Sequence, residues 1–283
     1  MTPLDHALIL GILQGLTEFL PVSSSGHLVL CQNLFGLTEP EVFFDLVLHL
    51  GTLSAVLVFY RTECLGIIKE LKTLFSFQRL RLAYRTRPLF RLGALILAGS
   101  LPTAVIGLLF KDFFTSLFSS LLAVGVNLCL TALFLFLAGF RKEATVKSEL
   151  EFPLWLALVV GFAQGLAISP GLSRSGVTIS IAILLGMERS LALRFSFLLS
   201  VPAVTGAVLL SLKDSSRSIF PAEALAAGFV TAAVVGFLSL ILLSFILKKD
   251  RFRVFVPWCL AVGALAIYLY CRHSGPGLLS LAF

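Results

Sequence analysis

Long apolar stretches separated by short polar ones are the dominant pattern of this 283-residue chain. A helix needs roughly 17–25 apolar residues to cross a bilayer, and six of the stretches reach that length. None of them shows the alternating ten-residue segments of a membrane barrel. The pattern therefore predicts an all-α, polytopic membrane protein with six transmembrane helices. We expect these helices over about residues 42–60, 89–110, 116–140, 191–212, 222–247 and 254–270.

Two further apolar segments are interrupted by a proline and a small polar loop. The first covers residues 3–35 and breaks at Pro21, and the second covers residues 153–186 and breaks at Pro170. Each half is short for a full crossing, and irregular backbone is tolerated at membrane depth only where protein or a water-filled cavity covers it. We therefore predict two re-entrant helix-loop-helix hairpins.

Charge adds an orientation to this picture. The chain is 58% hydrophobic and only 13% charged, and its net charge of +7 resides in loops. Residues 61–91 have a net charge of +6, and residues 248–253 are also basic, so both loops should be cytoplasmic. They share one side only if both hairpins are re-entrant. We interpret this charge as a topology signal and expect no nucleic-acid partner.

Sequence similarity between the two halves indicates an internal duplication. Both hairpins contain a Gly-x-x-Gln-Gly-Leu segment, beginning at Gly11 and at Gly161, and both contain Ser-x-Ser-Gly, beginning at Ser23 and at Ser173. The offset is 150 residues in each case. We predict one membrane domain over residues 1–283 made of two inverted-topology repeats, residues 1–140 and 153–271. Hairpins that enter from opposite faces would meet near the midplane.

Glu18 and Arg174 are the two formally charged residues deep in the apolar segments. A charge at that depth costs about 3 kcal/mol on insertion scales, which makes each residue a functional-site hypothesis. The alternative is a structural ion pair that holds the two hairpins together. Gln14 shares a helix face with Glu18, so together they are candidate hard-oxygen ligands for a divalent cation. Glu18 is alternatively a general base.

The helix restarts after both prolines are candidate phosphate sites, because free backbone N–H groups and the positive helix end would point to the midplane. Arg174 adds a planar guanidinium fork for phosphate oxygens, and Thr178 lies one turn later. A serine at such a position is typically only an N-cap, yet two matched clusters favour a binding role. The predicted substrate-binding residues are Gln14, Ser23, Ser25, Gly26, Gly171, Ser173, Ser175, Gly176 and Thr178.

Ser24 and His27 are the candidates for the chemical step. Ser24 is a candidate nucleophile, and His27, within helical reach of Ser23 and Ser24, is its candidate base or leaving-group acid. A single histidine in a membrane is also typical of a structural hydrogen bond. Attack by water activated by Glu18 or His27 stays open. Asp45 and His49 form another pair four residues apart, for which we expect a structural or entrance role.

The residues named so far lie in three segments: QGLTEFLPVSSSGH over residues 14–27, PGLSRSGVT over 170–178 and FSFLLSVP over 195–202. With them the chain resembles the undecaprenyl-pyrophosphate phosphatases of the bacitracin-resistance family. The first two segments match that family's (E/Q)xxxE and PGxSRSxxT signatures. Two departures are Gln14, which removes one carboxylate, and SSSGH where many members have SSTGH.

The resemblance implies a multi-pass enzyme of the bacterial cytoplasmic membrane, with its site open to the external face. Its substrate would be the C55 isoprenoid diphosphate, hydrolysed to the monophosphate and inorganic phosphate to recycle the lipid carrier for cell-wall synthesis. It further implies dependence on a divalent cation, Mg²⁺ or Ca²⁺. Expected partners are the polyprenyl diphosphate lipid and the bilayer, and a homodimer is an allowed assembly.

Parts of the sequence also resemble two other functional classes. Inverted repeats with broken helices are typical of secondary carriers, so the same site could bind a polyprenyl phosphate and transport it. The SSSGH segment alone would also suit a type-2 phosphatidic-acid phosphatase. That hypothesis fails because Arg174 is not followed by that family's histidine and aspartate, and no lysine-rich opening motif precedes it.

Overall fold

The structure, a computed structural model, describes all residues except 1, 35–41, 71–76, 142, 212–219 and 274–283. The described part is helical and contains no strand, only one isolated bridge between Val146 and Met187. This confirms the predicted all-α class. The helices are α1 Pro3–Phe19, α2 Ser24–Leu34, α3 Val42–Phe59, α4 Arg61–Glu70, α5 Phe77–Thr86, α6 Pro88–Leu109, α7 Lys111–Leu117, α8 Leu121–Ala138, α9 Leu154–Leu166, α10 Arg174–Leu184, α11 Arg189–Ser211, α12 Ala222–Lys248, η2 Phe252–Phe255 and α13 Val256–His273.

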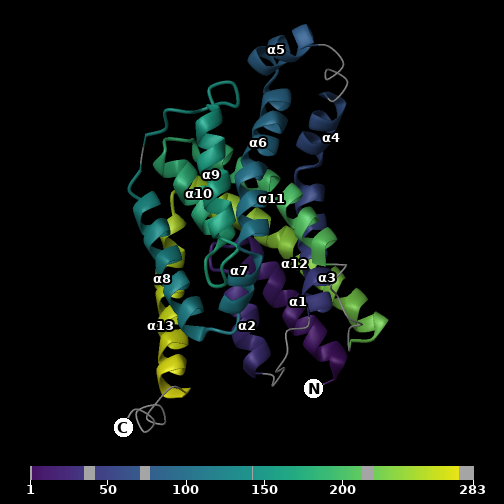
Figure 1. Cartoon of the computed structure of the whole chain (residues 1–283), viewed down its shortest axis with the longest axis vertical. Helices are drawn as coiled ribbons and strands as arrows, with labels where there is room; N and C mark the ends of the chain where they lie inside the picture. The colour runs from purple at the N-terminus through teal and green to yellow at the C-terminus, as the bar shows by residue number, and fades with distance from the viewer. Residues whose placement is uncertain (1, 35–41, 71–76, 142, 212–219, 274–283) are drawn as a thin grey trace.

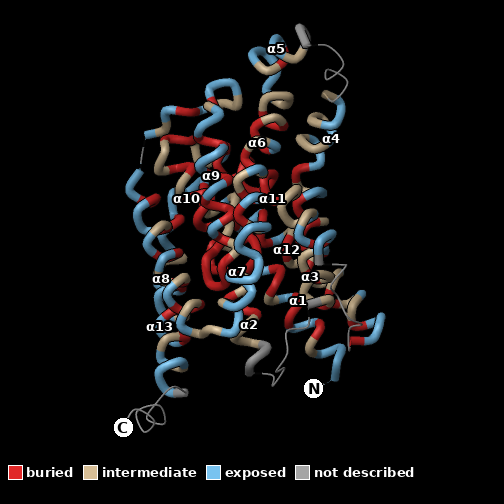
Figure 2. The backbone as a smooth tube through the Cα atoms, viewed as in Figure 1, coloured by how far each residue is buried: buried red, intermediate tan, exposed pale blue. Residues whose placement is uncertain are grey.

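Five of the described helices are long and apolar enough to cross a membrane, and the α3–α4 pair, bent by 77°, makes a sixth candidate. The predicted polytopic character is therefore confirmed. Many leucine, valine and phenylalanine residues are exposed. Exposed residues lie on the outside of the molecule, around a buried interior (Figure 2). In water such a surface would aggregate, whereas in a bilayer lipid tails cover it. Three short helices, α4, α5 and α7, occupy segments predicted as loops or helix ends.

Both interrupted segments form a helix, a turn and a second helix. Helix α1 begins with a capping box in which Thr2 and Asp5 bond each other's backbone N–H groups. Helices α1 and α9 each end a few residues before the proline that breaks the segment. The tips contact each other, because an added Cβ at Gly26 would lie 3.2 Å from the Gly171 Cα, and one at Gly176 would lie 3.2 Å from the Pro21 Cβ.

Each hairpin packs against a helix from the other half of the chain: α1 against α12, and α9 against α6 (Figure 1). Glycines make this close approach feasible. A Cβ at Gly11 would lie 2.9 Å from the Gly228 carbonyl oxygen, and a Cβ at Gly161 would overlap the Gly99 carbonyl. Small residues at a helix interface let the backbones approach and gain van der Waals contact, which drives helix association in lipid. The two halves are thus interlocked.

The basic helices α4 and α5, and the basic residues 248–253 between α12 and α13, lie toward one end of the molecule. The start of α1 and the end of α13 lie toward the other end (Figure 1). This agrees with the single side assigned to the basic segments by the charge count. The connecting contacts are Arg91 to the Phe152 carbonyl at 2.8 Å, Arg194 to Glu149 at 2.6 Å, Arg189 to Asp250 at 2.6 Å, and Arg253 to the Gly139 carbonyl.

Candidate active site

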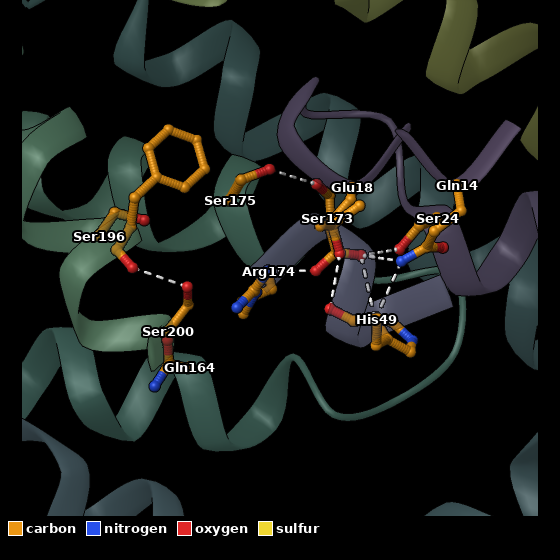
Figure 3. A network of polar contacts seen from close by, with 12 residues as sticks. Gln14, Glu18, Ser24, His49, Gln164, Ser173, Arg174, Ser175, Ser196 and Ser200 are labelled. Atoms are coloured by element: carbon orange, nitrogen blue, oxygen red, sulfur yellow. Dashed lines mark hydrogen bonds and ion pairs between the residues drawn. The ribbon is translucent and has the colours of Figure 1, made fainter. Parts of the chain in front are cut away.

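The Glu18 carboxylate is the centre of the site. Its Oε1 is paired with the Arg174 guanidinium, and its Oε2 accepts hydrogen bonds from the Ser24 hydroxyl at 2.6 Å and the Gln14 amide at 3.0 Å (Figure 3). Glu18 itself is buried, with 7% of its surface exposed. A buried carboxylate requires such compensation, since its desolvation costs several kcal/mol. Both hairpins thus contribute to one charged centre.

Gln14 is buried, and its neighbours determine how its amide is oriented. Its Nε2 lies 3.0 Å from Glu18 Oε2 and 2.9 Å from His49 Nδ1, so it donates to both. The reverse orientation would place the amide oxygen against the carboxylate. Gln14 Oε1 then points away from both groups and has no partner among the described residues. A buried acceptor without a partner is a free ligand for a proton donor or a cation.

Arg174 is the first residue of α10, and its guanidinium reaches across to Glu18 from the helix N-terminus. Only its Nη2 is used in that pair. Its Nη1 is buried and has no partner in the described structure. Guanidinium groups bind phosphate through two parallel hydrogen bonds, and the unused nitrogen is available for one of them. The ion pair between Glu18 and Arg174 that the structural hypothesis predicted is therefore present, but it leaves the Arg174 Nη1 nitrogen without a partner.

The predicted serine clusters form matched N-caps. Ser23 accepts from the Gly26 N–H at 3.3 Å, and Ser173 accepts from the Gly176 N–H at 3.1 Å. The hydroxyl of Ser25 lies 3.3 Å from that of Ser23, and the hydroxyl of Ser175 lies 3.3 Å from that of Ser173. These four hydroxyls therefore hold the two helix starts in shape. The side chains of Ser24 and Arg174, between them, remain directed to Glu18.

Gly171 and Thr178 lie behind the site and support it. Gly171 has a φ of +85°, a left-handed conformation that favours glycine, and a Cβ there would overlap the Val124 backbone. The Thr178 hydroxyl donates to the Arg174 carbonyl at 2.7 Å and contacts Ser196. The structure records no contact of Thr178 with the guanidinium among the residues it describes. Both residues shape the loop rather than line the centre.

His27 is bonded away from Ser24. Its Nδ1 lies 2.8 Å from the Ser23 carbonyl oxygen, and its Nε2 accepts from the Trp258 indole N–H at 3.0 Å. Both ring nitrogens are therefore used. The Ser24 hydroxyl has the Glu18 carboxylate as its partner instead. The predicted Ser24–His27 partnership is not the arrangement found in the described residues.

Three residues of the site were assigned another role or none from the sequence. His49, for which a structural or entrance role was expected, lies 3.6 Å from Glu18 Oε2 and accepts from Gln14. Thr131 accepts from the Ser173 backbone N–H at 2.9 Å and so fixes the second loop. Trp258 bonds His27 from the last helix. The spacing of Asp45 and His49 in the sequence indicated that His49 has a role. Nothing in the local sequence indicates a role for Thr131 or Trp258.

The residues present fit a divalent cation that arrives with a phosphate ligand. Within the described ranges, no group of three His, Cys, Asp or Glu side chains could hold a metal alone. Glu18 and the free Gln14 Oε1 are hard oxygen donors on one face of α1. Mg²⁺ is bound in this way in many enzymes, by one or two protein ligands plus substrate phosphates. The donor set is therefore incomplete alone and suitable with a diphosphate.

Comparison with known proteins identifies close relatives over most of the chain. The model of the family described as Bacitracin resistance protein BacA matches residues 7–265. A protein named undecaprenyl-diphosphatase from Desulforapulum autotrophicum is 45% identical, covering 93% of this chain and 97% of that protein. Proteins of the same name from Carboxydothermus hydrogenoformans and Desulfosudis oleivorans are 44% and 42% identical, covering 93% and 96% of this chain and 96% and 100% of theirs.

Proposed function

The chain belongs to the bacitracin resistance protein family, and we propose that Glu18, Ser24 and Arg174 carry out its reaction. The enzyme is an integral-membrane undecaprenyl-diphosphatase. It hydrolyses undecaprenyl diphosphate to undecaprenyl phosphate and inorganic phosphate. The reaction returns the lipid carrier to peptidoglycan synthesis and gives bacitracin resistance.

The observation that carries the site assignment is the convergence of Ser24 and Arg174 on one buried carboxylate. Ser24 and Arg174 are only partly buried, so a substrate can reach them. Arg174 brings an unused nitrogen for the phosphate oxygens. The arrangement places a nucleophile, a base and a phosphate ligand around one point, which is what phosphoryl transfer requires.

In the proposed reaction Ser24 Oγ attacks the terminal phosphorus while its proton passes to Glu18 Oε2, 2.6 Å away. The bond from that phosphorus to the bridging oxygen breaks, and undecaprenyl phosphate leaves with the bonding electrons. Water then attacks the phosphorus of the phosphoserine, the bond from phosphorus to Ser24 Oγ breaks, and Glu18 returns its proton to Oγ as inorganic phosphate is released. Arg174 stabilises the charge on the phosphoryl oxygens, aided by the N-termini of α2 and α10.

His27 need not supply a proton in this scheme. The leaving group is a phosphate monoester, whose second pKa is about 6, so it departs as an anion without an acid. Both His27 nitrogens are already bonded, to Ser23 and Trp258. Direct attack by water activated by Glu18 is the competing scheme. In that scheme water attacks the phosphorus, and Ser24 only orients the Glu18 carboxylate.

We further propose that Glu18 and Gln14 would hold Mg²⁺ or Ca²⁺ together with the substrate. Glu18 and Arg174 together are neutral, so the site by itself does not balance the charge of a diphosphate. A divalent cation would supply that balance and polarise the phosphoryl group. The support is the unpartnered oxygen of the Gln14 amide, whose nitrogen bonds the Glu18 carboxylate.

The membrane orientation is proposed from charge. The basic end should face the cytoplasm of a bacterial inner membrane, which places both termini and the start of α1 outside. The site would then open to the external face, where the first hairpin enters. A homodimer stays a prediction.

Phosphate release by purified protein in detergent tests the proposal. With undecaprenyl diphosphate and Mg²⁺, the enzyme should release inorganic phosphate, and a chelator should stop it. A carrier would release none, because detergent solution has no second compartment. Trapped phosphoserine at Ser24 would support covalent catalysis, whereas its absence during rapid turnover would favour direct attack by water.

A further inference from the structure

Trp258 lies on the lipid-facing side of α13, yet its indole nitrogen is directed into the protein. The side chain is 54% exposed, and its N–H donates to His27 Nε2 at 3.0 Å. The two ring planes lie within 5° of each other, with centroids 6.0 Å apart. The indole N–H therefore bonds the imidazole from a ring that lies nearly parallel to it.

This contact determines which His27 nitrogen carries the proton. An indole N–H is a donor only, so His27 Nε2 must be the acceptor and cannot be protonated. The proton is therefore on Nδ1, where it donates to the Ser23 carbonyl oxygen at 2.8 Å. His27 is held as one neutral tautomer by two contacts together, the Ser23 carbonyl at Nδ1 and, at Nε2, a residue 231 positions away in the sequence.

The Ser23 carbonyl belongs to an unusual stretch of backbone. Ser23 has a φ of 70°, in the left-handed region that residues other than glycine rarely adopt. The turn at Ser23 directs the next residue, Ser24, to Glu18. A conformation of this kind persists only where surrounding contacts impose it. The His27 Nδ1–H is such a contact.

We infer that Trp258 is a positioning residue for the reaction: it fixes the His27 tautomer, which holds the Ser23 turn and thereby the Ser24 hydroxyl on Glu18. The inference rests on the proposed role of Ser24. It assigns His27 a positioning role as well, in place of acid–base catalysis. The chain of contacts runs from the lipid-facing surface to the nucleophile through two side chains.

The test compares single and double variants in the full-length protein. Trp258→Phe retains an aromatic ring but removes the N–H donor. It should lower kcat roughly five- to tenfold, the worth of one hydrogen bond, with little change in KM because Arg174 is untouched. Trp155→Phe is the matched control, since Trp155 is also 54% exposed, on α9. It should retain wild-type kcat.

A second pair of variants separates positioning from simple packing. In His27→Asn the amide can still donate to the Ser23 carbonyl, but it has no tautomers and is too short to bond Trp258. His27→Asn should therefore keep more activity than His27→Ala. Adding Trp258→Phe to His27→Asn should cost nothing further. An equal loss in both backgrounds would overturn the inference, as would an equal loss in Trp155→Phe.

Nitrogen-15 NMR of labelled histidines gives a readout that does not depend on turnover. The signal lost in His27→Asn identifies His27 among the four histidines of the chain. It should report the Nδ1–H tautomer in the wild type and a mixture of tautomers in Trp258→Phe. An unchanged tautomer in that variant, or an Nε2–H tautomer in the wild type, would refute the inference even if the proposed reaction stands. Conversely, if the wild type shows no turnover, the proposed reaction is refuted, and the spectrum still tests whether Trp258 controls the His27 tautomer.

Discussion

Ser24 and Arg174 stand at the same position of the two hairpins, 150 residues apart, and each bonds one oxygen of the Glu18 carboxylate. The flanking serines are also matched, because Ser23 and Ser173 each cap their own helix. In the proposed reaction the first turn supplies the nucleophile, Ser24, and the matching turn supplies the phosphate ligand, Arg174. The carboxylate between them comes from the first copy alone, since the position that corresponds to Glu18 is Ile168.

Removing Arg174 should separate its catalytic role from its structural one. Arg174→Ala leaves the Glu18 charge buried without a partner, so we expect a loss of about 3–5 kcal/mol in unfolding free energy. Activity should fall at least about 100- to 1,000-fold. The double variant Glu18→Gln/Arg174→Gln should recover most of the stability and none of the phosphate release. Recovery of both would mean that the pair is purely structural.

Ser24→Ala distinguishes the two mechanisms by magnitude. If Ser24 is the nucleophile, kcat should fall by about 1,000-fold or more. If water attacks directly, only one hydrogen bond to Glu18 is lost, and the decrease should be about tenfold. Ser239→Ala is a matched control, because that buried hydroxyl donates at 2.9 Å to Val235 of its own helix. Steady-state phosphate release from the purified variants is the measurement.

A second carboxylate at position 14 should increase the dependence on cations. In Gln14→Glu the new charge lies next to Glu18, so the two carboxylates repel each other until a cation binds between them. We expect the half-saturating Mg²⁺ concentration to fall about fivefold or more, and Mg²⁺ to raise the Tm of the variant more than that of the wild type. Titration of activity and of thermal unfolding after chelation measures both. Full activity of the chelated wild type would exclude the cation.

The glycine contact between α9 and α6 should be essential for stability. Gly161→Ala forces the two backbones apart, since its Cβ would overlap the Gly99 carbonyl, and should cost about 2 kcal/mol or more. Gly206→Ala in α11 is the control, because its Cβ would meet nothing within 4 Å. That change should be neutral or slightly stabilising. Thermal unfolding in detergent tests both, and equal Tm values would contradict the packing argument.

Much of the site could be predicted because its residues lie in two short segments of the sequence. Two charged residues, two prolines and two serine clusters in apolar surroundings are visible in the sequence, and an inverted pairing brings them together. The duplicated spacing also predicted that the hairpin tips would meet, as Gly26 and Gly171 do. The short helices α4 and α5 were not predicted, because a segment rich in arginine and lysine reads as a loop.

The contacts that were not predicted join residues far apart in the sequence, or depend on a backbone conformation that the sequence does not reveal. His49 is 35 residues from Gln14, and Trp258 is 231 residues from His27, so no spacing rule connects them. Helical spacing placed His27 near both Ser23 and Ser24, and it is the Ser23 carbonyl that the ring bonds. The left-handed turn at Ser23 then directs Ser24 to Glu18 instead.

The packing of α1 against α12 also sets an order of events during synthesis. Helix α1 is synthesised before its glycine-matched neighbour α12, which spans Ala222–Lys248. At about 5–20 residues per second, the first hairpin therefore waits roughly 10–45 s for that neighbour. Arg174 follows Glu18 by 156 residues, so for roughly 8–31 s of synthesis the carboxylate has no arginine opposite it. A newly inserted chain must shelter this carboxylate from lipid by other means, such as water or the insertion machinery.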